Sequence, residues 1–144
     1  MIEKLSDKNL LGAIKFYVKE ERKATHTVLK HLLEVQKRKL FADLGYSSLF
    51  QYLVRELKYS EGQASLRISA MKLMKSSPKA EKKIKSGKLN LSNASLLQRT
   101  LESNPGLEVK RELLIDEVSD KSKSQAQDCL FNHHPEINKP KNKK

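Results

Sequence analysis

The side chains of this chain best suited to chemistry are basic ones, and they are concentrated between positions 67 and 88. This stretch holds eight basic residues and a single acid, a local charge of +7 within a net charge of +12. The basic residues are Arg67, Lys72, Lys75, Lys79, Lys82, Lys83, Lys85 and Lys88. Because lysine and arginine bind phosphates, the stretch predicts a surface for a polyanion such as nucleic acid. The alternatives are a lysine-rich face that only keeps the protein soluble, or an anionic membrane surface as the partner.

Two predicted helices position the start of this stretch. The segment 47–75 has the pattern of a helix–turn–helix, in which two amphipathic helices are joined by a tight turn. The first helix is expected to end near Leu57, and Ser60 followed by Gln63 matches a capping box that starts the second helix. In a DNA-binding helix–turn–helix, this second helix enters the major groove.

The second helix, 61–75, has one narrow polar sector on a helical wheel. The sector contains Glu61, Ser65, Ser69, Lys72 and Lys75. Small serines allow close approach to a phosphate, but the sector lacks the Arg, Asn and Gln side chains that contact base edges. Phosphate contact with double-stranded DNA is therefore favoured over base recognition. The predicted DNA-binding residues are Ser60, Gln63, Ser65, Arg67, Ser69, Lys72, Lys75, Lys79, Lys82, Lys83, Lys85 and Lys88.

Arg67 has two possible roles, because the wheel places it inside the apolar sector of the second helix. One is structural, with the guanidinium paired to Glu56 or another carboxylate while the stem packs. The other is a DNA contact made at the rim of the core.

The rest of the chain also shows helical signals. Ser6 or Asp7 starts a helix whose apolar face is Leu10, Leu11, Ile14, Tyr17 and Val18. The polar run 19–23 predicts a kink or break in this helix. Thr25 is a predicted N-cap of a second helix, and Gly45 is predicted to end it. Further helices are expected near 79–85, from Ser92 or Asn93, after the turn 104–106, and from Ser122 to about Asn132.

These signals, with few Gly and Pro residues, no Trp and 6% aromatic residues, predict a compact all-α domain of seven or eight helices over 1–134. Residues 135–144 have no apolar period and end basic, so a disordered tail is predicted.

No finished catalytic site is evident. Cys129, His133 and His134 lie within about one helical turn and could ligate zinc, but the remaining ligands of a tetrahedral site are lacking. We therefore expect no enzyme activity, metal or cofactor. The single cysteine excludes an intramolecular disulfide, and no signal peptide or membrane-spanning run is present, which predicts a cytoplasmic protein.

Several runs resemble the N-terminal helical region of bacterial HNH endonuclease-like proteins. They are LGYSSLF (44–50), YSEG (59–62), RISA (67–70) and GKLNLS (87–92), and the similarity covers roughly 15–130. The resemblance implies a helical module associated with DNA. In such proteins an HNH nuclease, built on His, Asn and a bound metal, would follow, and here the chain stops where that module would begin.

The sequence thus predicts a non-catalytic DNA-binding protein, acting as a regulator or accessory module. One alternative is a helical module that forms a homodimer or docks a partner helix through the apolar stripes of its first helices. The other is a truncated HNH-type nuclease without its catalytic domain.

Overall fold

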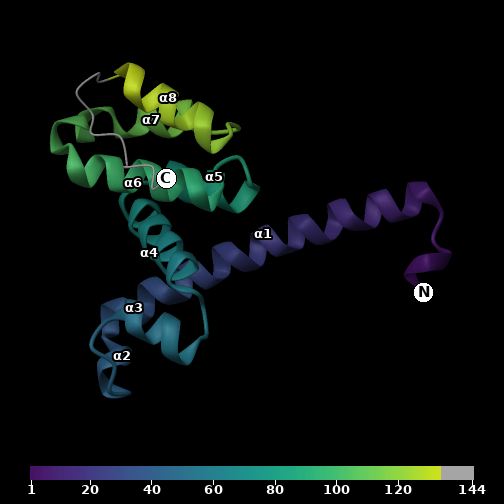
Figure 1. The fold of residues 1–144 in the computed structure, drawn as a ribbon, viewed down its shortest axis with the longest axis horizontal. Coiled ribbons are helices and arrows are strands. Elements are labelled where there is room, and N and C mark those ends of the chain that lie inside the picture. The colour runs from purple at the N-terminus through teal and green to yellow at the C-terminus, as the bar shows by residue number, and fades with distance from the viewer. Residues whose placement is uncertain (134–144) are drawn as a thin grey trace, which may run out of the picture.

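The computed structural model describes residues 1–133, which form helices and turns without any strand (Figure 1). The α-helices are α1 (Asp7–Arg38), α2 (Leu40–Asp43), α3 (Leu49–Gln51), α4 (Glu61–Ser76), α5 (Pro78–Ser86), α6 (Leu91–Ser103), α7 (Arg111–Glu117) and α8 (Lys123–His133). Short 3-10 turns, η1 (Ile2–Lys4) and η3 (Pro105–Lys110), and a π-helical turn, η2 (Tyr52–Glu56), complete the described chain. The predicted all-α class is confirmed, and the predicted tail, 135–144, lies outside the described residues. Within residues 1–133, no helix has both the length and the apolar character required to cross a membrane.

Helix α1 is one unbroken helix of 32 residues, so the break predicted at 19–23 is wrong. That run contains only Lys, Glu and Arg, which have good helix propensity. Thr25, predicted as a cap, lies inside the helix, and its hydroxyl donates to the Glu21 carbonyl at 3.0 Å. Ser6 caps the helix as predicted, since its Oγ accepts from the Asn9 amide at 3.2 Å.

The end of α1 is set by backbone conformation. Lys39 is left-handed, with φ of 52°, and separates α1 from the short α2. Gly45 follows α2 with φ of 90°, a region that favours glycine, so the predicted helix stop is confirmed.

Helix α4 is the central helix of the fold and packs against α1, α5 and α6 (Figure 1). Its buried residues are Ala64, Ala70, Met71, Leu73 and Met74. The same hydrophobic cluster includes Leu29 of α1, Ile84 of α5 and Leu97 of α6. Burial of this apolar surface is the main stabilising contribution to the body of the protein.

The side-chain caps at the starts of α8 and α4 differ in completeness. Ser122 and Gln125 form the reciprocal pair, with the Gln125 amide donating to Ser122 Oγ at 3.2 Å and the Ser122 amide donating to Gln125 Oε1 at 3.0 Å. At the start of α4, Ser60 Oγ accepts from the Gln63 amide at 3.2 Å, but the Gln63 side chain binds elsewhere. The position of each helix start is nevertheless as predicted.

The start of α6 was expected at Ser92 or Asn93, and the structure instead caps it with Asn90. Asn90 Oδ1 accepts from the Asn93 amide at 2.8 Å. The Asn93 side chain is buried, and its amide donates to the Val118 and Lys121 carbonyls at 3.2 and 2.7 Å. Asn93 therefore ties α6 to the segment that links α7 to α8.

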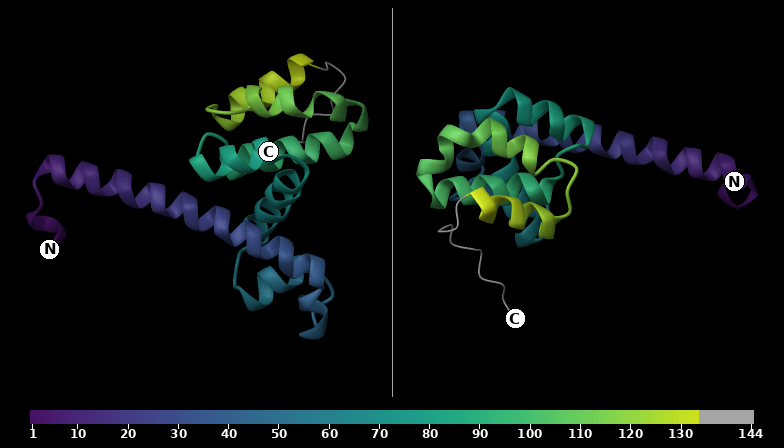
Figure 2. Two further views of the ribbon diagram at one scale, coloured as in Figure 1. Left: turned by 180° about the vertical axis from the view of Figure 1, so that it is seen from behind. Right: turned by 90° about the horizontal axis from the view of Figure 1, so that it is seen from above.

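The N-terminal half of α1 extends away from the rest of the protein as a single rod (Figures 1 and 2). Its predicted apolar face is mostly exposed: Leu10 is 41% exposed, Leu11 62%, Ile14 54% and Tyr17 67%. The first buried residue of α1 is His26, so the body covers only the C-terminal part of this helix.

We expect Leu73→Ala to lower the free energy of unfolding by about 2–5 kcal/mol, because it leaves a cavity where α4 packs in the core. Leu44→Ala is the control, since Leu44 is 60% exposed and its truncation should change stability by less than about 0.5 kcal/mol. Urea denaturation followed by circular dichroism measures both, and equal losses would contradict a central role for α4.

Candidate nucleic-acid interface

The predicted helix–turn–helix segment contains two helical stretches joined by a turn at residues 57–60. Helix α3 continues directly into η2, and α4 follows the turn, where Lys58 has a positive φ of 64°. The Tyr46 hydroxyl donates to Glu56 Oε2 at 2.5 Å, and this hydrogen bond raises the pKa of Tyr46 above its ordinary value. This bond joins the loop before α3 to the end of η2.

Arg67 is held by Gln63 of α4 and by Tyr59 in the turn before it, and not by Glu56 or another carboxylate as its predicted structural role required. Its guanidinium lies 4.3 Å from the centre of the Tyr59 ring, a cation–π arrangement. The same group donates to Gln63 Oε1 at 2.6 Å and to the Gln63 carbonyl at 3.2 Å. Arg67 and Gln63 are thus engaged with each other and with the turn before α4.

The narrow polar sector of α4 is on the surface, as the helical wheel indicates. Ser65, Lys72 and Lys75 are exposed, and Ser69 is half-buried. Ser60 uses its Oγ as the N-cap of the helix, so its hydroxyl is already occupied as an acceptor. Toward the C-terminal end, this sector faces α1.

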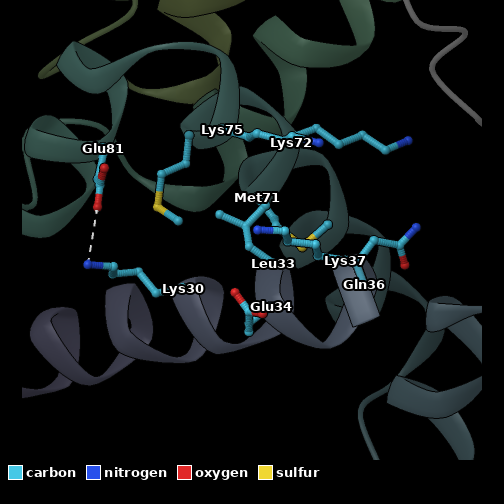
Figure 3. Close-up of a pocket in the computed structure, with 10 residues that line it drawn as sticks. Lys30, Leu33, Glu34, Gln36, Lys37, Met71, Lys72, Lys75 and Glu81 are labelled. Atoms are coloured by element: carbon cyan, nitrogen blue, oxygen red, sulfur yellow. Dashed lines mark ion pairs between the residues drawn. The ribbon is translucent and has the colours of Figure 1, made fainter. Parts of the chain in front are cut away.

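An open groove of about 760 Å³ lies between α1 and α4, with α5 at one end (Figure 3). We call it the basic groove; its lining residues are Lys30, Leu33, Glu34, Gln36, Lys37, Met71, Lys72, Met74, Lys75 and Glu81. The floor is apolar, from Leu33 and the two methionines, and lysines come from both sides. The groove therefore joins residues of α1 to predicted site residues about 40 positions later.

Both acids of the basic groove are paired with other side chains of the protein. Glu34 accepts from Arg38 Nε at 2.7 Å, and this hydrogen bond lowers the pKa of Glu34 below its ordinary value. Glu81 lies 3.1 Å from His26 Nε2 and 3.9 Å from Lys30 Nζ. Since these carboxylates are already paired, the lysines determine the charge that the groove presents to a ligand.

Two of the groove lysines have no ion pair within residues 1–133, namely Lys37 and Lys75. Lys72 has a long one, 3.8 Å from Glu102 on α6, with both side chains about half-exposed. A surface pair of this kind is worth little, so Lys72 can exchange its partner for a phosphate.

Helix α5 divides the remaining lysines into two groups. Lys79 and Lys83 both pair with Asp116 of α7, the second at 2.7 Å, and Lys83 also donates to Ser119 at 3.1 Å. Lys82 and Lys85 are exposed, and no ion pair within residues 1–133 involves them. Lys88, after the helix, is exposed as well. The predicted lysine surface is thus partly committed to holding α5 against α7.

Lys30 and Lys37 were not among the predicted site residues. Their spacing of seven places them on one side of α1, and Glu34 between them marks the same side. The sequence contains that signal, but only the tertiary packing of α1 on α4 shows that this side adjoins Lys72 and Lys75.

Cys129 and His133, near the end of α8, belong to no ligand cluster within residues 1–133. His133 pairs through Nε2 with Glu117 of α7, and Cys129 is half-buried. Over residues 1–133, no three His, Cys, Asp or Glu side chains are grouped closely enough to hold a metal ion. His134 lies outside the described residues.

No protein-family model, curated protein or solved structure matches this chain significantly. The resemblance to the helical region of HNH endonuclease-like proteins stays a prediction from the sequence. The function of the protein is therefore inferred from the geometry and charge of the basic groove.

Asp116 provides a test of the link between α5 and α7. Hydrogen bonds from Lys79, and secondly from Lys83, lower the pKa of this carboxyl below its ordinary value. Because the folded pKa is the lower one, the pair stabilises the protein above the pKa of the unfolded chain, and this contribution is lost as the pH falls through the folded value. We expect Lys79→Met to raise the pKa of Asp116, measured by NMR titration, whereas Lys82→Met leaves it unchanged. An unchanged pKa in Lys79→Met would contradict the pairing.

Proposed function

We propose that the protein binds double-stranded DNA without catalysis, through phosphate contacts made by the basic groove. The supporting observation is that Lys30 and Lys37 of α1 line the same groove as Lys72 and Lys75 of α4, while both acids of the groove are paired with other side chains of the protein. Lys37 and Lys75 have no ion pair among residues 1–133, and Lys30 and Lys72 have only long ones, at 3.9 and 3.8 Å. Several lysines along one groove suit a chain of phosphates, whose negative charges recur at regular intervals. Lys82 and Lys85 extend the positive surface on α5.

The contacts proposed here are with the DNA backbone. Helix α4 is covered by α1, α5 and α6, so beyond its exposed first turn (61–63) it presents mainly the strip that contains Ser65, Lys72 and Lys75. A recognition helix needs a wide exposed face with donors and acceptors for base edges. Gln63 is the one amide side chain among the predicted DNA-binding residues, and its oxygen accepts a hydrogen bond from Arg67. Binding of this type depends on salt and only weakly on sequence.

We expect the protein to bind a labelled random-sequence duplex with a dissociation constant in the micromolar range or tighter at low salt. The double variant Lys37→Glu/Lys75→Glu should weaken binding and lower the slope of log K against log salt by about 2, since each phosphate contact contributes about 0.9. Fluorescence anisotropy over a salt series measures both quantities.

The matched control is Lys121→Glu/Lys123→Glu, which makes the same change in net charge just before α8 and at its first residue, outside the lining of the groove. It should bind nearly as the natural sequence does. If both double variants lose affinity equally, net charge and not the groove determines binding. If the natural sequence fails to bind at low salt, the proposed function is wrong.

We also expect supercoiled plasmid to remain intact with Mg²⁺, Mn²⁺ or Zn²⁺, because the described residues offer no metal-binding cluster. Gel analysis after prolonged incubation is the measurement. Metal-dependent nicking that co-purifies with the protein and is lost in His133→Ala would instead support the nuclease alternative.

A further inference from the structure

The exposed half of α1 has an apolar stripe that continues an interface already formed within the protein. The stripe consists of Leu10, Leu11, Ile14, Tyr17 and Val18. Eleven residues along a helix is close to three full turns, so Tyr17 and Val18 lie in line with Val28 and Leu29. Leu29 is fully buried and Val28 packs against the same core, where α4 and α5 cover α1. The two apolar segments therefore share one side of α1 and are separated there by Glu21 and Thr25. The C-terminal segment is covered and the N-terminal segment is exposed.

A row of basic side chains borders the stripe along its whole length. Lys8, Lys15, Lys19, His26 and Lys30 follow one another at spacings of seven, four, seven and four, which keeps them on one side of the helix. Between positions 8 and 19 there are three lysines and no acid. The basic border thus extends from the covered half into the exposed half.

In the covered half, α5 packs on the apolar stripe of α1 and supplies a carboxylate to its basic border. Helix α5 buries Ala80 and Ile84 in the core and directs Glu81 to the basic border, 3.1 Å from His26 and 3.9 Å from Lys30. In the exposed half, no ion pair within residues 1–133 involves Lys8, Lys15 or Lys19. What is missing there is a helix with an apolar stripe and carboxylates on the matching side.

We propose that residues 8–19 of α1 dock an amphipathic acidic helix of a partner protein, in the manner of α5 on the covered half. The partner inserts its apolar side chains against Leu11, Ile14 and Val18 and pairs its carboxylates with Lys15 and Lys19. A second copy of this chain fits less well, because the net charge of +12 repels it and an antiparallel pairing brings the two basic borders together. The proposal is independent of DNA binding by the basic groove.

The test uses the full chain and two synthetic helical peptides of about 20 residues, a length that supports a helix. Both have leucines at helical spacing; one has glutamates beside the leucines and the other has lysines there. We expect the glutamate peptide to bind with micromolar affinity, since the interface is small, and the lysine peptide not to bind. Lys15→Glu/Lys19→Glu should reverse this preference.

Ile14→Asp should weaken glutamate-peptide binding by about tenfold or more, because it places a charge in the apolar contact. Phe16→Asp is the matched control: Phe16 is 51% exposed and lies about 200° from Ile14 around the helix. Its ring lies beside that of Tyr17, with 5.2 Å between the ring centres, and Tyr17 is not one of the three residues proposed to contact the partner. Both side chains are exposed, so helicity and the unfolding midpoint should match the natural sequence in both variants.

Three results would overturn the proposal. The first is equal binding of both peptides, or of neither. The second is recruitment to phosphatidylserine vesicles that depends on Ile14 without binding of the glutamate peptide, which makes a membrane surface the occupant. The third is a dimer mass in sedimentation analysis that Ile14→Asp abolishes while the peptide does not bind, which makes the occupant a second copy.

Discussion

The burial of α4 between α1, α5 and α6 is the constraint on which the rest of the structure depends. A helix covered on three sides keeps only a narrow polar strip, and here α1 passes beside that strip. The basic groove is the space left between them. The charge of the groove depends on the same packing. Helix α5 brings Glu81 to His26 and Lys30, so this carboxylate is already paired and is less available to repel a negatively charged ligand. Core packing and surface charge are therefore coupled in this protein.

Much of the fold was predictable because its signals are local. Ser6, Ser60 and Ser122 each mark a helix start, and Gly45 and Gly87 each have the positive φ that ends a helix. The failures were also informative. The polar run 19–23 lacks an apolar period, but helix propensity and continuity with the caps at each end keep it helical. At α6, several nearby residues could cap the helix, and the buried bonds of Asn93 to residues beyond α7 decided in favour of Asn90.

The candidate site was predictable only in part, for a physical reason. The helical wheel of α4 identifies Lys72 and Lys75 as exposed, since exposure there follows from the apolar period of one helix. It cannot identify Lys30 and Lys37, because their role depends on which side of α1 meets α4. A run of lysines likewise gives the number of charges but not their partners: Lys79 and Lys83 meet an aspartate 37 and 33 residues away. The same holds for Gln63 and Arg67: the sequence shows two polar side chains, but only the structure shows that they hydrogen-bond to each other.

The continuity of α1 has a geometric consequence. At 1.5 Å per residue, the 20 positions between Ile14 and Glu34 amount to a separation of about 30 Å along the axis and a fixed rotation about it. The continuous helix thus fixes the distance and the rotation between the exposed stripe and the basic groove. Inserting one residue between positions 19 and 25 would rotate the stripe by about 100° relative to the groove. Inserting seven residues would move the stripe about 10 Å farther from the groove and would nearly preserve the side of the helix on which it lies. The charged run 19–23, for which the sequence predicts a kink or break, is part of the continuous helix and so sets both the distance and the angle.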